Sequence, residues 1–374
     1  MTMTCIAINE EIIAVTKDLY IDCYDGENHK IINVTSNNSQ KDDKITDIVI
    51  SSDGKYLAVI TSSTKKLIVY NLLTFKEEKV YALPRSASKI RFTVDNSNIL
   101  VADKTGDGLL YDISSVDSGT KLLGHLSLLL NILQSEDGKY IITSDRDEKI
   151  RVTCYPKTYV IHTYCLGHVE FVNHIELLPH NAKYLISTSG DGTVRCWDYE
   201  KGKLCHTIDT YLDVKDESLL EEFKKIMDKE GVEVERLPVV LFTIDKLNVS
   251  CSVIALCIHL IKKVFLYTIE FHNEQFVHKL ICTLDINYEP MGIKIYNSSL
   301  FIYFSNCEIS EYKIQTNNLQ ITVDFVKKLN VFNNIDKSSL NCNFETSIKV
   351  LYKRKFDNVQ EYQERKKQRL GILK

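Results

Sequence analysis

Short apolar runs alternate with polar, turn-forming clusters along most of this 374-residue chain. Four stretches share one pattern, a cluster of Asp, Asn or Gly followed by aliphatic and β-branched residues: SDGKYLAVI at 52–60, DNSNILVA at 95–102, EDGKYIITS at 136–144 and HNAKYLIST at 180–188. The cluster is typical of a tight turn, and the apolar run after it is typical of a buried strand. The chain is therefore predicted to repeat a β-unit.

A second pattern, an aromatic residue followed by a polar one, keeps the same register. Six such pairs are present, and a degenerate pair falls where a seventh is due: Tyr24-Asp25, Tyr70-Asn71, Tyr111-Asp112, Thr153-Cys154 (the degenerate pair), Trp197-Asp198, Tyr267-Thr268 and Tyr312-Lys313. The successive intervals are 46, 41, 42, 44, 70 and 45 residues, and each pair is expected to end a strand. Seven marks at this spacing predict an all-β fold, a seven-bladed β-propeller over residues 1–328.

The stretch at 167–198 carries the pattern most completely, since it opens with Gly-His and closes with Trp-Asp. These are the two marks of a WD repeat, in which four antiparallel strands make one blade. We expect His168 to hydrogen-bond Asp191, and Ser187 and the indole of Trp197 to complete a small buried network. These four residues are interpreted as structural.

The one long interval contains an insertion of about 27 residues at 211–237. Apolar residues recur there at helical spacing among charges, which predicts one short amphipathic helix: Leu219, Leu220, Phe223, Ile226 and Met227. Two interpretations are open for this helix, a solvated decoration packed on the side of the propeller and a docking site for a partner.

The C-terminal extension, 329–374, changes character near residue 353. From there the chain carries eight Lys or Arg against three acidic residues, which predicts a basic helix or tail outside the propeller core. Such a run is typical of a nuclear-import signal or of contacts with phosphate. A merely solubilising terminus is the alternative.

The amino-acid composition and the net charge argue against some classes of protein. The formal net charge of -4 argues against a chain coated with basic residues for nucleic-acid binding, although it permits a local basic patch. The 11 cysteines form no CxxC pair, and several lie in apolar runs, so we expect free thiols in a reduced compartment. With no basic-then-apolar leader and no apolar run of roughly 18 residues, a soluble intracellular protein is expected.

The motifs of common enzymes are missing from the sequence: it has no GxGxxG, GxxxxGK[ST], HExxH or GxSxG. Gly-Asp-Gly at 106–108 and 190–192 suits β-turns, and His125 and His168 occupy matching Gly-His positions, so neither a metal nor a cofactor is expected. A propeller hydrolase would need carboxylates facing one another on innermost strands. The predicted innermost strands are mostly apolar instead: ITDIVI, ASKIRF and VNHIEL. A non-catalytic role is therefore favoured.

The fourth blade departs from the repeat. Thr153 stands where Trp is expected, Asp147 is interpreted as the counterpart of Asp191, and charges gather over 145–151. A blade that loses structural marks while gaining exposed charge is a candidate contact surface. Arg151 matches Arg195 in register, so partner binding and blade packing are both open for it.

Four segments resemble one family, the non-catalytic WD-repeat subunit of the eukaryotic tRNA (guanine-N7)-methyltransferase: SDRDEKIRV at 144–152, CLGHVEFV at 165–172, SGDGTVRCWDYEKGK at 189–203 and FDNVQEYQERKKQRL at 356–370. The resemblance implies a partner subunit that binds S-adenosylmethionine and methylates a guanine in the tRNA variable loop. The propeller is implied to dock on that subunit, stabilise it and help to hold tRNA, without a cofactor of its own.

Carried onto this chain, the resemblance implies that Asp147, Lys149 and Arg151 contact the partner. The candidate tRNA contacts are basic, and for those of the tail contact with the partner subunit is equally open: Arg146, Lys353, Arg354, Lys355, Arg365, Lys366, Lys367 and Arg369. A nuclear location is expected, with the cytoplasm as a second one. The alternative function is an interaction hub in another complex, such as a ubiquitin-ligase substrate receptor.

Overall fold

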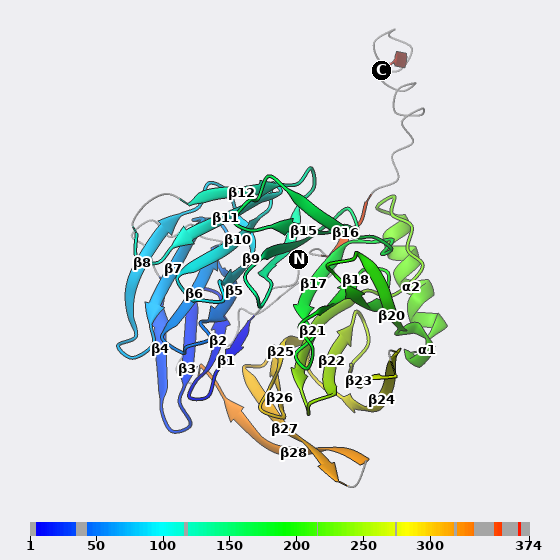
Figure 1. The fold of residues 1–374 in the computed structure, drawn as a ribbon. Coiled ribbons are helices and arrows are strands. Elements are labelled where there is room, and N and C mark those ends of the chain that lie inside the picture. The colour runs from blue at the N-terminus through cyan, green and yellow to red at the C-terminus, as the bar shows by residue number, and fades with distance from the viewer. Residues whose placement is uncertain are drawn as a thin grey trace.

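The structure, a computed structural model, describes residues 5–34, 43–115, 119–214, 216–273, 275–317, 320–332, 348–353 and 366–367. Within these ranges the strands form seven four-stranded antiparallel sheets, each made of four strands that are consecutive in the chain. The sheets stand around a central axis as the blades of a propeller (Figure 1). The predicted seven-bladed, all-β fold is confirmed.

The blades follow chain order, and the first strand of each is innermost. Blade one has β1 (Ile6–Ile8), β2 (Ile13–Lys17), β3 (Tyr20–Tyr24) and β4 (His29–Asn33). Blade two has β5 (Ile45–Ile50), β6 (Tyr56–Thr61), β7 (Lys66–Asn71) and β8 (Lys76–Ala82). Blade three has β9 (Ala87–Phe92), β10 (Asn98–Asp103), β11 (Asp107–Asp112) and β12 (Thr120–Gly124). Blade four has β13 (Leu129–Gln134), β14 (Tyr140–Asp145), β15 (Ile150–Cys154) and β16 (Ile161–Cys165).

The remaining three blades complete the ring. Blade five has β17 (Val172–Leu177), β18 (Tyr184–Ser189), β19 (Thr193–Asp198) and β20 (Lys203–Asp209). Blade six has β21 (Val239–Lys246), β22 (Cys251–Ile258), β23 (Lys263–His272) and β24 (Gln275–Asp285). Blade seven has β25 (Pro290–Tyr296), β26 (Ser299–Phe304), β27 (Glu308–Asn317) and β28 (Gln320–Asn330).

The aromatic–polar marks all lie on the third strand of a blade. In five blades the pairing of this strand with the outer strand shifts by a β-bulge beside the mark, at Tyr70, Thr153, Trp197, Tyr267 and Tyr312. Thr153 therefore occupies the position of Trp197 in blade four, as predicted. In blades six and seven the expectation that the mark ends its strand was wrong. There the third strand continues beyond the mark and pairs with the outer strand as far as His272 and Asn317.

The innermost strands were predicted to be apolar, but β9, β17 and β25 present charged side chains to the channel. Along β9 and β17, Ile90 and Ile175 are fully buried, whereas Lys89, Arg91 and Glu176 line the central cavity. For these strands the prediction of an apolar lining was wrong, because successive side chains of a strand point to opposite faces. The fraction of apolar residues in such a strand combines its two faces, so it does not reveal the polar face toward the channel.

Blade one closes against blade seven without exchanging a strand. Innermost strands β1 and β25 are neighbours, and beyond β28 the chain inserts Val331 and Phe332 into a cluster shared by the two blades. The backbone N–H of Phe332 donates to a buried carboxylate oxygen of Asp22 at 2.8 Å. His29 Nδ1 lies 3.1 Å from the same carboxylate. A short segment after the last strand thus seals the ring.

The insertion forms two helices, α1 (Tyr211–Val214) and α2 (Glu217–Asp228), where one was predicted. A single four-residue turn such as α1 is too short to leave an apolar period in the sequence. The Asp216 carboxylate caps α2 by accepting from the Leu219 N–H at 3.1 Å. Leu220, Phe223 and Met227 are buried in the large apolar cluster that also contains residues of blades five and six, which supports the interpretation of α2 as a decoration packed on the propeller.

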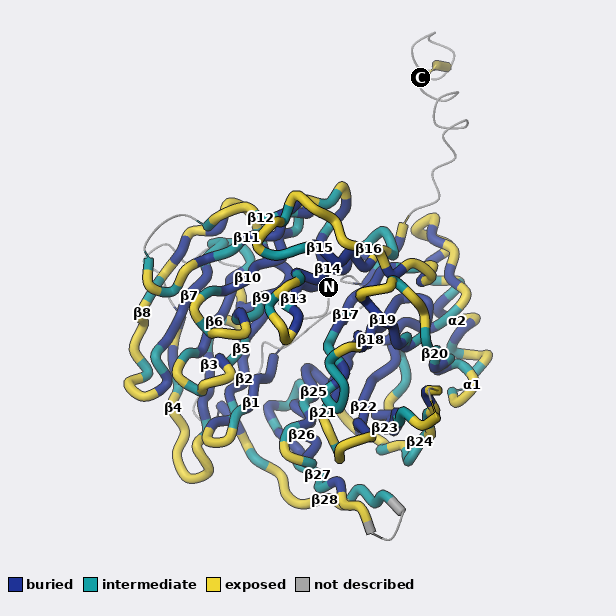
Figure 2. The backbone as a smooth tube through the Cα atoms, in the orientation of Figure 1, coloured by how far each residue is buried: buried dark blue, intermediate teal, exposed yellow. Residues whose placement is uncertain are grey.

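Exposure follows this architecture: most strands are buried along their inner parts, and exposed residues gather on outer strands and turns (Figure 2). All ten cysteines within the described ranges are free thiols, and seven of them are buried. In the same ranges, no helix has the length and apolar character that crossing a membrane requires.

Phe332→Ala is expected to destabilise the protein by about 3–5 kcal/mol, because it removes a fully buried ring from the closure between blades one and seven. Urea unfolding followed by intrinsic fluorescence measures this loss. Phe325→Ala on β28, where the side chain is exposed, is the matched control and should cost far less. Equal losses for the two variants would show that Phe332 does not secure the closure.

Candidate functional site

Blade five contains the buried network that its sequence predicts. His168 Nδ1 lies 2.8 Å from Asp191 Oδ2, and its Nε2 lies 2.8 Å from Ser187 Oγ. The indole N–H of Trp197 donates to the same Ser187 Oγ at 2.8 Å. Burial by itself would raise the pKa of Asp191, but the bonds from His168 and Thr193 hold it well below its usual range. Asp191 is therefore ionised, and His168 is used for blade structure.

Blade four contains a variant of this network. His125 Nδ1 lies 2.9 Å from Asp145 Oδ2 and its Nε2 lies 2.9 Å from Thr143 Oγ1. By strand register Asp147 does occupy the position of Asp191, as predicted, but Asp145, two residues earlier, makes the bond to histidine. The Thr153 hydroxyl, which replaces the indole, is buried and has no hydrogen-bond partner among the described residues.

This change leaves Asp147 at the surface. Its carboxylate lies 3.8 Å from Arg146 Nε and 3.9 Å from Lys353 Nζ, and its side chain is partly exposed. Lys149 is exposed and lies in the same turn, held by a hydrogen bond from its backbone N–H to Asp145. Two of the predicted partner-binding residues, Asp147 and Lys149, are accordingly presented to solvent together.

Arg151 is placed differently. It pairs with Thr143 as Arg195 pairs with Ser187, so the predicted equivalence of the two arginines holds. Its side chain is buried, and Nη1 donates to the Gly124 carbonyl at 2.9 Å. Of the two interpretations of Arg151, the geometry supports blade packing.

Exposed apolar side chains surround the charged turn. Ile150 pairs with Cys165, so Lys149 lies beside Leu166, which is 61% exposed. The backbone N–H of Arg146 donates to Leu128, which brings the loop containing Leu126 to the same end of the blade. We define the blade-four surface by the exposed residues of this end and of the outer strand β16: Leu126, Lys149, Ile161, Tyr164, Leu166 and Val169.

The apolar part of this surface was not predicted from sequence. Leu126 and Val169 each follow a Gly-His pair, and a large apolar residue in such a loop is the signal that could have revealed it. Apolar side chains that stay exposed together on a protein surface are typical of a protein-interaction site. Of the charged residues predicted to bind a partner, Lys149 lies within this surface, Asp147 lies beside it and Arg151 is buried beneath it.

Part of the C-terminal extension returns to the propeller. Tyr352 is buried, its ring lies 5.0 Å from that of Phe171, and its hydroxyl donates to the Gly190 carbonyl at 3.1 Å. Lys353 pairs with Glu148 as well as with Asp147. We call Ile348–Lys353, residues 348–353, the C-terminal latch. The prediction placed the tail outside the core, and missed that Ile348, Leu351 and Tyr352, just before the basic run, are buried against the propeller.

The candidate tRNA contacts differ in their surroundings. Lys353 forms ion pairs within the chain, Arg146 is partly buried, and Lys366 and Lys367 are exposed. The other four lie outside the described residues: Arg354, Lys355, Arg365 and Arg369. No group of three His, Cys, Asp or Glu side chains suited to a metal ion occurs in the part of the chain that is described.

Glu170 connects the latch to the blade network. Burial, followed by the negative charges of Glu148 and Asp191, raises the pKa of Glu170 to about 7, while Lys353 opposes this rise. Glu170 is consequently titrated near neutral pH at the place where the latch docks.

Together, the seven sheets and the His–Asp–Ser–Trp network define the chain as a WD-repeat β-propeller. Solved structures agree at the level of the fold: a chain of the structure titled "Crystal Structure of Mitotic Checkpoint Complex" aligns over 84% of this chain and 91% of its own length, with a TM-score of 0.67 and 10% identity. "Structure of U3-55K" aligns over 81% and 88%, with a TM-score of 0.62 and 17% identity.

The sequence match is more specific. The family model described as "tRNA methyltransferase TRM82 WD40 domain" matches residues 17–121 and 115–323, so the chain belongs to this family.

Curated relatives share one description, tRNA (guanine-N(7)-)-methyltransferase non-catalytic subunit. The chain is similar to wuho of Drosophila mojavensis, with 47% identity over 167 residues, which is 42% of each protein. It is also similar to wdr4 of Xenopus laevis, with 42% identity over 175 residues, 46% of this chain and 44% of the relative. The matches span less than half the length of these relatives.

Glu170→Gln is expected to make the stability less dependent on pH. The pKa of Glu170 in the folded protein, about 7, lies above its ordinary value of 4.5, so its contribution is present below 4.5 and is lost as pH rises through 7. The melting temperature of the natural protein should therefore fall more than that of the variant between about pH 5 and pH 8. Glu77→Gln, at an exposed site on β8, serves as control. Identical pH profiles for Glu170→Gln and the natural protein would contradict the assignment.

Proposed function

We propose that this chain is the non-catalytic subunit of a tRNA (guanine-N7)-methyltransferase. Membership of the TRM82 WD40 family carries the proposal, and the curated relatives named as non-catalytic subunits support it. In this proposal a separate subunit binds S-adenosylmethionine and performs the methyl transfer, and the propeller docks on and stabilises that subunit. The histidines of the Gly-His pairs, His125 and His168, are held in blade networks, which supports a structural use of both.

The blade-four surface is where we place the docking. It combines apolar side chains, which supply most of the free energy when they are buried at an interface, with the cation of Lys149 at its margin. The antiparallel pairing of β15 with β16 and the closure of the His125 network hold these side chains on a rigid support. The charge of Lys149 suits a carboxylate on the partner and would orient the encounter.

Ile161→Asp is expected to weaken association with the catalytic subunit at least tenfold, because a charge would be buried in an apolar contact. Co-purification of the two coexpressed subunits, followed by calorimetric titration, measures this. Val80→Asp is the matched control, since Val80 is a similarly exposed residue on β8, the outer strand of blade two. Unchanged binding and tRNA methylation with Ile161→Asp would place the interface elsewhere. Arg151→Glu is a poor probe, because Arg151 is buried and its loss would disturb the blade itself.

The basic tail is where we place a contribution to tRNA binding. Since Lys353 is engaged by Glu148 and Asp147, the latch fixes where the tail leaves the propeller, close to the blade-four surface. Lys366 and Lys367 are exposed and suit the phosphate backbone. The tail would thus extend the cationic surface of the complex beyond the catalytic subunit.

Replacing Lys366 and Lys367 together by Gln should weaken tRNA binding by the complex and flatten its salt dependence. Each lost phosphate contact lowers the slope of log K against log salt by roughly 0.7 to 0.9. Filter binding at several salt concentrations measures the slope. Lys30 and Lys76, exposed on the outer strands of blades one and two, provide the control pair. A slope equal to that of the natural complex would remove these two lysines from the tRNA interface.

An interaction hub of another complex is the second candidate, because an apolar docking surface suits other proteins too. Affinity purification with mass spectrometry separates the two: our proposal requires a methyltransferase as a stoichiometric partner and no methylation by the purified chain alone. We also propose a nuclear location, with the cytoplasm as a second site, on the basis of the basic tail.

A further inference from the structure

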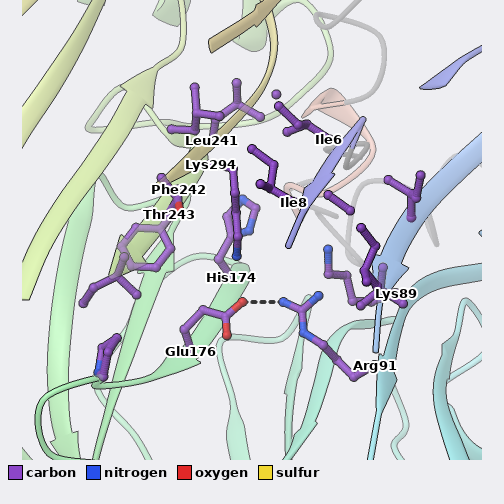
Figure 3. A pocket seen from close by; sticks show the side chains of 18 of the residues that line it. Ile6, Ile8, Lys89, Arg91, His174, Glu176, Leu241, Phe242, Thr243 and Lys294 are labelled. Atoms are coloured by element: carbon purple, nitrogen blue, oxygen red, sulfur yellow. Dashed lines mark hydrogen bonds and ion pairs between the residues drawn. The ribbon is translucent and has the colours of Figure 1, made fainter. Parts of the chain in front are cut away.

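The centre of the propeller contains a cavity of about 310 Å³. Innermost strands of six blades line it: β1, β5, β9, β17, β21 and β25. Its wall is apolar on one side, with Ile6, Ile8 and Leu241, and carries charged side chains from β9, β17 and β25 (Figure 3). None of these residues belongs to the blade-four surface, which lies on the outside of the ring.

The charges of this cavity do not balance. Lys89 Nζ lies 2.8 Å from Asp47, and Arg91 donates to Glu176, so two cations are matched by two carboxylates. Lys294 makes no hydrogen bond or ion pair with any residue that the structure describes, and its charge is felt by Glu176.

His174 does not alter this balance. Burial, and then the charge of Lys89, lowers the pKa of His174 to about 4, so the ring is neutral at physiological pH. Its Nε2 lies 3.2 Å from the Val240 carbonyl, to which it can only donate. The cavity therefore holds one uncompensated cation.

A groove of about 500 Å³ continues from the cavity at one mouth of the channel. Its lining combines apolar side chains with polar ones, among them Asn96, Gln134 and Glu136. The two spaces share Arg91 and Glu176 together with four apolar neighbours, so they meet at this ion pair. Phe92, Val94 and Leu133 line the groove, and Val94 is 51% exposed. An extended chain lying in the groove would thus have apolar contacts outside and a cation further in.

We propose that this mouth binds an extended segment of a partner protein, with an Asp or Glu side chain entering the cavity toward Lys294 and apolar side chains on either side of it in the groove. A free phosphate would use Lys294 but leave the groove empty, whereas a peptide uses both. The proposal does not depend on the methyltransferase assignment, because the two surfaces share no residue.

Selection of a random dodecapeptide display library on the immobilised full chain tests the proposal. The expected consensus has an acidic residue between apolar ones, and a labelled consensus peptide should bind at least tenfold more weakly to Lys294→Gln, as measured by fluorescence polarisation. Lys294→Arg should retain most of the affinity, and Lys30→Gln, at an exposed site on β4, should retain all of it. A peptide with Asn or Gln in place of the acidic residue should lose binding to the natural chain.

Val94→Glu provides a second variant in case Lys294→Gln unfolds, since Val94 is half-exposed and a carboxylate there should repel the acidic peptide without lowering the melting temperature. Failure to enrich an acidic-apolar consensus, or binding that neither variant weakens, overturns the proposal. Calorimetric binding of inorganic phosphate that Lys294→Gln abolishes, with no peptide enriched, would also overturn it in favour of a small-anion site.

Discussion

Closure of the ring is the constraint on which the other features depend. Seven innermost strands meet around one channel only if blade one packs on blade seven, which is the last blade along the chain. Each blade here is complete in sequence, so no shared strand can provide the seal. The buried Asp22 carboxylate, the N–H of Phe332 and the apolar cluster around them provide it. Since both faces of every blade need a neighbour to bury their apolar residues, an open ring would expose two of these faces.

Within blades four and five, a second constraint is the pairing of buried polar groups. Blade five satisfies it with Asp191, His168, Ser187 and Trp197. In blade four His125 pairs with Asp145 and Thr143 instead, and the buried Thr153 hydroxyl has no partner among the described residues. Asp147 makes no bond to the histidine and faces the latch. The irregular network of this blade and the surface position of Asp147 thus have one origin.

The candidate site was only partly predictable. Charge density and the lost tryptophan directed attention to residues 145–153, and Lys149 and Asp147 do lie at the surface there. Charge density does not predict which of these residues are buried. Arg151 and Lys149 carry the same charge and lie two positions apart, yet Arg151 is buried and Lys149 is exposed. The docking of Tyr352 on Phe171 joins residues 181 positions apart, and no local pattern specifies such a contact.

The sequence by itself determined the number of blades, the turn clusters, the position of the degenerate fourth mark and the network of blade five. These are all periodic or local, so they leave a signal within one repeat. Only the tertiary structure decided which carboxylate pairs with His125, how the ring closes, where the latch docks and that the channel is charged. Each of these depends on distances between blades and on which face of a strand a side chain occupies, and a one-dimensional pattern of polar and apolar letters does not contain them.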